Sequence, residues 1–128
     1  MPLALPAAIA ACVLLAALAV FQVALIAGAP LGRFAWGGQH EVLPSKLRIG
    51  SATSIILYVF IAYVGLAKAG LAPPLVSDGF TDVTCWVLTG YFALGIVLNG
   101  ISRSKPERML MTPTVLVLTV LYLILSLN

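Results

Sequence analysis

Charged residues are scarce in this chain. Aspartate, glutamate, lysine and arginine make up 9% of its 128 residues, whereas soluble proteins carry about 25%. Hydrophobic residues make up 62%, which is more apolar surface than a soluble domain of this length can bury. The composition therefore excludes a soluble fold and predicts a lipid bilayer as the surrounding medium. The net charge of +3 is small and the basic residues adjoin apolar segments, so we expect no nucleic-acid partner.

Cysteine and histidine are also nearly missing. The two cysteines, Cys12 and Cys85, lie far apart and form no CxxC motif, which excludes a disulfide scaffold and a cysteine-based metal site within one chain. The single histidine, His40, has no second histidine or cysteine nearby, which excludes a zinc set and bis-histidine haem ligation. We therefore expect no metal and no cofactor, and we assign no catalytic residue.

Four long apolar segments are the main feature that is present. A helix needs about 20 largely apolar residues to cross a bilayer, and it satisfies its own backbone hydrogen bonds in lipid. The predicted spans cover residues 3–27, 49–67, 83–101 and 105–127, with the apolar part of the last from residue 110. The sequence thus predicts an all-α integral membrane protein, a single four-helix bundle with a glycine-rich loop at residues 28–48.

Short motifs predict where these helices begin and end. Gly28 followed by Pro30 ends the first helix, because glycine adopts the left-handed cap and proline cannot continue a helix. Ser104 and Glu107 have the spacing of a capping box, so we expect the fourth helix to begin near residue 105 and assign the carboxylate to the cap. Residues 81–82, a threonine and an aspartate, suit the start of the third helix.

The basic residues predict the orientation. Arg33, Lys46, Arg48, Arg103, Lys105 and Arg108 fall in or beside the first and third connections, and only Lys68 lies on the other side, with Asp78 and Asp82. Positive residues accumulate on the cytoplasmic side of membrane proteins. We therefore predict that both of these connections face the cytoplasm and that both termini face outward (N-out/C-out).

No aspartate, glutamate, lysine, arginine or histidine lies within the apolar segments. Proton-coupled pumps and voltage sensors need such groups at membrane depth, so this absence argues against both classes. Small and uncharged polar residues instead share three helix faces, which we expect to point into the bundle. These faces are Ala4, Ala8, Ala11, Leu15, Leu18 and Gln22; Ser51, Ser54, Tyr58, Ala62 and Gly65; and Cys85, Thr89, Phe92, Ile96 and Asn99.

Polar residues on these faces predict a cluster in the cytoplasmic half of the membrane. Gln22, Ser51, Ser54 and Asn99 fall at that depth, and Tyr58 lies on the same face as the two serines. Two interpretations remain open. These residues either hold the helices together by hydrogen bonds, or they line a ligand pocket or a polar permeation path.

The first loop is long for a connection between two membrane helices, and such loops are usually functional or disordered. Its aromatic and aliphatic residues argue against disorder, so we expect it to fold back against the membrane face. Its candidate structural residues are Gly28, Pro30, Gly32, Gly37, Gly38 and Pro44, and further candidate ligand-binding residues on this side are His40, Arg48, Arg103 and Arg108. Arginine suits anionic lipid head groups or another anion, while the same charges also set the orientation.

The pattern of the two predicted cytoplasmic loops resembles that of a group of small bacterial four-span membrane proteins without an assigned activity. The first loop contains GAPLG, GG and LPSKLR, and the second contains SRSKPER with a proline just inside the last helix. Matching positions are Gly28, Pro30, Gly32, Gly37, Gly38, Leu43, Pro44 and Arg48, then Ser102, Ser104, Glu107, Arg108 and Pro113. The resemblance implies a location in the bacterial inner membrane.

Three functions are consistent with these features. The first is a non-catalytic accessory or self-associating subunit, in a homo-oligomer or a larger membrane complex, because no catalytic constellation is present. The second is an oligomeric channel or carrier for a neutral or weakly charged small solute, lined by the polar cluster. The third, an interfacial enzyme that uses His40, Glu41 and the arginines, has the least support, because acid–base catalysis needs groups that converge.

Overall fold

The computed structural model describes residues 3–128. The four long helices are α1 (Ala4–Ile26), α2 (Ser45–Lys68), α3 (Asp78–Gly100) and α4 (Lys105–Ser126), and two short 3-10 helices, η1 (Gly32–Phe34) and η2 (Trp36–Gly38), lie in the first loop. Each long helix is long and apolar enough to cross a bilayer. The chain is therefore a multi-pass membrane protein, and the predicted all-α four-helix fold is confirmed.

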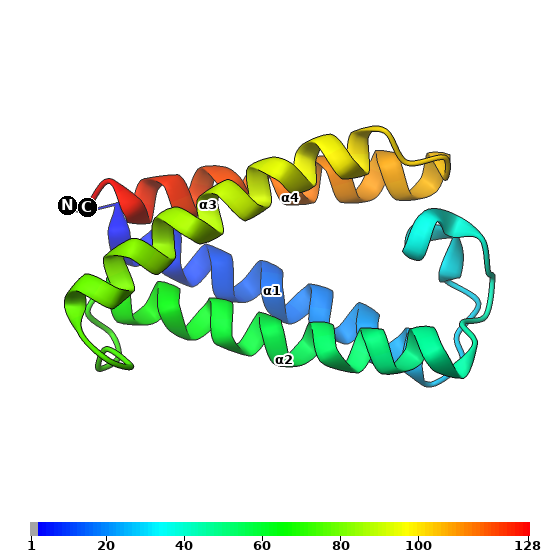
Figure 1. Cartoon of the computed structure of the whole chain (residues 1–128), viewed down its shortest axis with the longest axis horizontal. Coiled ribbons are helices and arrows are strands. Elements are labelled where there is room, and N and C mark those ends of the chain that lie inside the picture. The colour runs from blue at the N-terminus through cyan, green and yellow to red at the C-terminus, as the bar shows by residue number, and fades with distance from the viewer. Residues whose placement is uncertain (1–2) are drawn as a thin grey trace.

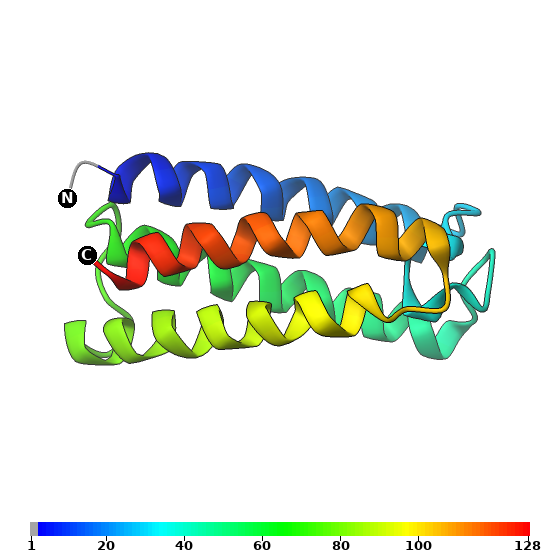
Figure 2. The same cartoon turned by 90° about the horizontal axis from the view of Figure 1, so that it is seen from above.

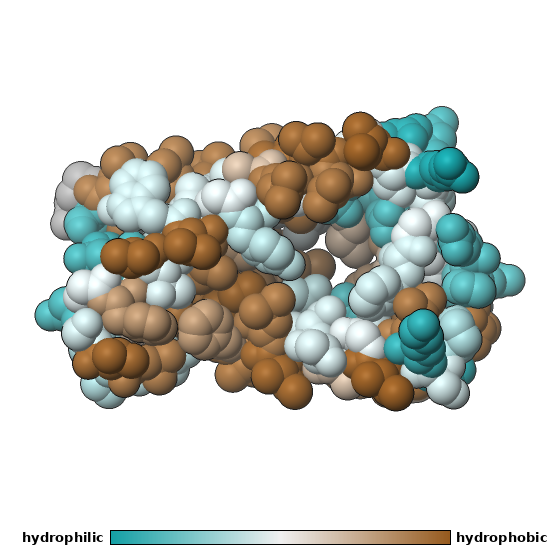
Figure 3. Space-filling model, in the orientation of Figure 1, coloured by the Kyte–Doolittle hydropathy of each residue, from teal (hydrophilic) through white to brown (hydrophobic). Residues whose placement is uncertain are grey.

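The helices form two antiparallel hairpins, α1 with α2 and α3 with α4, which lie one over the other (Figure 1). Both chain ends and the 69–77 connection lie at one end of the bundle, which we call the terminal end. The first loop and the 101–104 connection lie at the opposite end, the loop end (Figures 1 and 2). On the face seen in Figure 3, hydrophilic residues gather mainly at the two ends and apolar residues cover the middle, as expected for a protein embedded in lipid.

The helix ends agree with the sequence motifs except at the third helix. α1 ends at Ile26, and Gly28 follows it with a left-handed φ of 95°. α3 begins at Asp78, so the predicted start at residues 81–82 is wrong. Ser77 is the N-cap, and its Oγ accepts a hydrogen bond from the Phe80 N–H at 3.0 Å. The apolar segment predicts too short a helix, because the first turn of α3 is polar and is expected to extend beyond the hydrocarbon layer of the membrane.

Replacing Ser77 by alanine is expected to lower the free energy of unfolding by about 1 kcal/mol, the typical cost of a lost serine N-cap. Asp82→Asn is the matched change at the helix start predicted from the sequence. It removes the charge from an ion pair with Lys68 in which the aspartate side chain is 55% exposed. An ion pair open to water on one side contributes little, and asparagine can still accept a hydrogen bond from Lys68, so this second variant is expected to be less destabilised. Unfolding of both variants in SDS would measure the difference. A larger loss for Asp82→Asn would contradict the cap assignment.

The closest packing extends from the terminal end to the middle of the bundle. Small residues of α1 meet larger side chains of the other helices in one core: Ala7, Ala8, Ala11, Leu15, Ile61, Val64, Cys85, Leu88, Phe92, Leu118, Tyr122 and Leu125. Tyr122 is fully buried, and its hydroxyl donates to the Ile61 carbonyl. It also lies against Gly65, whose missing side chain leaves room for the Tyr122 hydroxyl beside the α2 backbone.

The three inward faces predicted from the sequence are confirmed, because every residue named on them is buried or half-buried. On α2 the deepest residues of the central and terminal part are Ile61, Val64 and Gly65. Tyr58 and Ala62 are only half-buried, so they flank this line. Tyr58 is thereby left free to face a space that the core does not fill.

The two hairpins diverge toward the loop end, where the first loop comes between them (Figure 1). A second small core holds this loop in place, formed by Leu25 of α1 with Ala35 and Leu43 of the loop. The loop therefore has a defined fold, as predicted. Because the hairpins diverge, the loop half of the bundle is less tightly packed than the terminal half.

Candidate functional site

A cavity of about 290 Å³ lies between the hairpins in the loop half of the bundle. Figure 3 shows the surface hollowed at this place, between the upper and lower helices and beside the loop. All four long helices and the first loop contribute to its wall. Most of the lining is aliphatic or aromatic, and the polar side chains in it are Gln22, Tyr58, Tyr91, Asn99, Glu107 and Thr114.

The mouth of the cavity faces the lipid between α2 and α3. Leu94 and Leu98 of α3 are each 56% exposed, and Leu57 of α2, opposite them, is 38% exposed. The far wall is buried, with Gln22 on α1 and Leu118 on α4. A molecule dissolved in the bilayer can therefore reach the cavity sideways, without passing through the loop.

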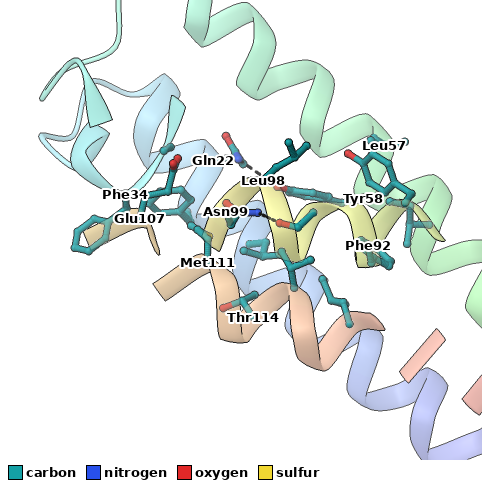
Figure 4. A pocket seen from close by; sticks show the side chains of 18 of the residues that line it. Gln22, Phe34, Leu57, Tyr58, Phe92, Leu98, Asn99, Glu107, Met111 and Thr114 are labelled. Carbon is teal, nitrogen blue, oxygen red and sulfur yellow. Dashed lines mark hydrogen bonds between the residues drawn. The ribbon is translucent and has the colours of Figure 1, made fainter. Parts of the chain in front are cut away.

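Gln22 is the buried polar side chain at the centre of this site. It is 8% exposed, and its Nε2 donates to the Tyr58 hydroxyl at 3.2 Å. Figure 4 shows the two side chains pointing toward each other. Its Oε1 is buried and has no hydrogen-bond partner among residues 3–128. Because a glutamine amide can be turned over, one end of this amide lacks a partner in either orientation, and such a group costs about 1–3 kcal/mol.

Asn99 of α3 brings a second amide to the same cavity. Its Nδ2 donates to the Gly95 carbonyl at 2.8 Å within the helix, and it is half-buried. Gln22, Tyr58 and Asn99 thus come from three helices to one space, as Figure 4 shows. Of the four residues predicted to cluster at this depth, Gln22 and Asn99 line the cavity, whereas Ser51 and Ser54 do not.

Glu107, in the first turn of α4, lines the loop end of the cavity and is 9% exposed. Ser104 caps the helix as predicted, since its Oγ accepts from the Glu107 N–H at 3.3 Å. The assignment of the Glu107 carboxylate to the cap is wrong. The carboxylate accepts from the Gly37 N–H at 3.2 Å and from the Ser102 hydroxyl, so it connects α4 to the first loop.

The first loop covers the loop end of the cavity with Phe34 and Trp36. The Trp36 indole N–H donates to Ser51 Oγ at 3.3 Å, and its ring lies over Gly50 of α2. Trp36 has a φ of 52°, which is unusual for a residue other than glycine. The two glycines that follow, Gly37 and Gly38, are also left-handed, so the turn that brings this indole onto α2 depends on them.

The other candidate ligand-binding residues lie outside the cavity wall. Ser51 accepts the Trp36 bond, and Ser54 donates to the Gly50 carbonyl at 3.1 Å. Arg48 donates to the Leu43 carbonyl at 2.7 Å, Arg108 donates to the Ser102 carbonyl at 2.9 Å, and His40 and Arg103 are exposed. Arg48 and Arg108 therefore hold loop backbone in place.

The sequence prediction missed Glu107, Phe34 and Trp36 as members of the site. One signal for Glu107 was present, because it is the only acidic residue close to the predicted polar cluster at the start of the last span. The capping-box spacing from Ser104 already accounts for a glutamate at this position, so the sequence gives no further reason to place it in a site. Phe34 and Trp36 join the cavity wall only because the first loop folds toward it, and no local sequence pattern indicates the direction in which a loop folds.

Comparison of the chain with protein-family models, with curated proteins and with solved structures finds no match. The function of this cavity must therefore be inferred from its own geometry and chemistry.

Proposed function

We propose that this membrane protein binds a small amphipathic molecule in the cavity between its hairpins, and that the molecule reaches the site from the bilayer between α2 and α3. The observation that carries this proposal is the unpartnered end of the buried Gln22 amide within an otherwise largely apolar cavity. A ligand with an apolar body and one hydrogen-bonding group fills the space and pairs that amide.

The chemistry of the wall supports an amphipathic ligand over a polar solute. Binding sites for small molecules are typically concave and mostly apolar, with a few polar groups that orient the ligand. Gln22, Tyr58 and Asn99 supply such groups here, and leucine and aromatic side chains supply the rest. A path for ions or strongly polar solutes would need polar groups free to pair with the solute along its length. Toward the terminal end the buried polar side chains are Thr81, Thr89 and Ser126, and they are hydrogen-bonded within the protein.

Of the functions predicted from the sequence, this proposal is nearest to the oligomeric channel or carrier for a neutral or weakly charged small solute, but it specifies a binding site only. The accessory or self-associating subunit stays a second prediction, and native mass in nanodiscs tests it. A monomer without a copurifying partner would contradict it.

The N-out/C-out orientation in a bacterial inner membrane is likewise proposed, and it rests on the six basic residues at the loop end. Four of them, Arg33, Lys46, Arg103 and Lys105, are exposed, and we propose that they contact anionic lipid head groups.

Photolabelling with 3-azioctanol, a neutral amphipathic alcohol, tests the binding site in nanodiscs. In the wild-type protein we expect the label on cavity residues to saturate and to be displaced by 1-octanol. Labelling of lipid-facing residues is expected not to saturate. Leu98→Trp places an indole in the mouth and is expected to reduce the saturable labelling about tenfold, the effect of losing about 1.4 kcal/mol of binding free energy. Val97→Trp is the matched control, because Val97 is 57% exposed on the same helix and does not line the cavity.

Gln22→Leu tests the polar half of the same proposal. Leucine has nearly the size of glutamine but cannot bond the alcohol, so saturable labelling is expected to weaken about tenfold while the protein stays folded. Labelling that is unsaturable in the wild-type protein would contradict the proposed function. So would equal labelling of the wild type, Leu98→Trp and Val97→Trp.

A further inference from the structure

We infer that the ligand of this cavity is an amphipathic cation whose head group lies against the Glu107 carboxylate. The inference rests on the proposed function and specifies its ligand. Glu107 is the only formally charged side chain in the cavity wall, and no lysine, arginine or histidine lines that wall. Its charge and its position therefore decide which head group the cavity accepts.

Glu107 is a buried carboxylate without a cationic partner in the described part of the chain. It is 9% exposed, yet the ion pair found among residues 3–128 joins Lys68 and Asp82 at the opposite end. The guanidinium of the adjacent Arg108 donates to the Ser102 carbonyl instead. Acidic side chains are rarely buried without a positive partner, because removing a charge from water is costly.

The contacts that Glu107 does make hold it in position without neutralising it. The Gly37 N–H and the Ser102 hydroxyl each donate one hydrogen bond to it, and the start of α4 contributes a partial positive charge. Each carboxylate oxygen accepts one of these bonds and has a second lone pair that can accept another. An ammonium group in the cavity would supply both the missing charge and the missing donors.

Aromatic rings around the cavity favour the same class of ligand. Phe34 and Trp36 of the loop, Tyr58 of α2, and Tyr91 and Phe92 of α3 all contribute to its wall. The faces of aromatic rings attract cations, and sites for quaternary ammonium groups are commonly built from them. An anionic head group would meet these rings and a carboxylate with no positive charge to balance it.

The layout of the cavity sets the direction of the ligand. Glu107 and Phe34 lie at the loop end (Figure 4), where α4 begins and where the membrane surface is expected. Leu18, Ile61 and Leu118 form the part nearer the middle of the bundle. An amphipathic cation therefore lies with its head at the interface and its tail toward the bilayer centre, as it would in lipid itself.

Displacement of the 3-azioctanol label by competitors with the same eight-carbon chain tests the inference. The competitors are octyltrimethylammonium, 1-octanol and octyl sulfate. Each is titrated in phosphatidylglycerol nanodiscs, and its concentration is expressed as the amount bound to the bilayer. In the wild-type protein we expect the cation to displace the label at about one-tenth of the octanol concentration, and octyl sulfate to be the weakest. This comparison needs no variant, so it stands even where a substitution disturbs folding.

Glu107→Gln removes the charge and keeps an oxygen that can accept from Gly37. The tenfold preference for cation over octanol is expected to fall to about one in this variant. Glu41→Gln is the matched control, because it removes a negative charge from an exposed position in the first loop, outside the cavity wall, and should keep the preference. Glu107→Asp, which keeps the charge, should retain part of it.

The outcomes separate this inference from the proposed function. Displacement by octanol without any preference for the cation, or a preference that survives in Glu107→Gln, overturns the cationic ligand and leaves an amphipath-binding cavity. Label that no competitor displaces overturns both. Adding phosphatidylethanolamine to the nanodiscs distinguishes the source of the ammonium group: a lipid head group as ligand would itself displace the label, whereas a free amphipathic amine as ligand leaves labelling unchanged by this lipid.

Discussion

A Gly65→Val variant is expected to lose about 3 kcal/mol of unfolding free energy, through overpacking of a closely packed core. A Cβ at this position would lie 2.9 Å from the Tyr122 hydroxyl oxygen and 3.5 Å from a methyl carbon of Leu125. Tyr122 cannot move aside easily, because it is fully buried and its hydroxyl donates to the Ile61 carbonyl. Unfolding in SDS, followed by circular dichroism, measures the loss.

Gly90→Val is the control for this experiment. Gly90 lies within α3, and an added Cβ there meets no atom within 4 Å. Both substitutions change helix propensity in the same way, so their difference isolates the contact between α2 and α4. We expect the control to change stability by less than about 0.5 kcal/mol. Equal losses in the two variants would show that close packing at Gly65 does not hold the bundle together.

A Gly32→Ala variant is expected to open the first loop while the four helices stay assembled. The new Cβ would collide with the His40 carbonyl oxygen and lie 2.8 Å from that of Glu41. The Gly32 N–H donates to the same Glu41 carbonyl at 2.8 Å, so the two segments of the loop cannot separate without losing this bond. A cost of about 2 kcal/mol would raise the open population of the loop about 30-fold.

Hydrogen exchange of residues 31–43 measures this opening, with the exchange of α1 as an internal reference. Gln39→Ala, an exposed change in the same loop, is expected to leave exchange unaltered. Opening also removes Phe34 and Trp36 from the cavity wall and the Gly37 bond from Glu107, so saturable labelling should fall with it. Unchanged exchange in Gly32→Ala would contradict the close approach seen between these loop segments.

The two predictions concern the two halves of one molecule. In the terminal half, Gly65 and the alanines of α1 allow close packing of the core. In the loop half, the hairpins diverge and the loop covers a cavity that holds an unpartnered amide and an unpaired carboxylate. The closely packed half is expected to contribute most of the stability, and the half with the cavity is where we propose that the ligand binds.

The fold itself was determined by local sequence properties. Four apolar segments of sufficient length predict four spans, because in lipid a single segment can satisfy its own backbone hydrogen bonds only as a helix. Gly28 and Ser104 mark two helix ends correctly, because caps depend on residues within a few positions. The inward faces follow from helical spacing alone. The start of α3 was misplaced because Ser77 lies outside the apolar segment.

Glu107 shows what the tertiary structure alone decided. Its distance from Ser104 along the chain indicates a capping carboxylate, but its oxygens bond Gly37, 70 positions away, and the side chain lines a cavity. Ser51 and Gln22, predicted to form one cluster, bond Trp36 and Tyr58 respectively. The angle between two hairpins and the side on which a loop folds are set by contacts between distant residues. No spacing within one helix encodes them, and they create the cavity.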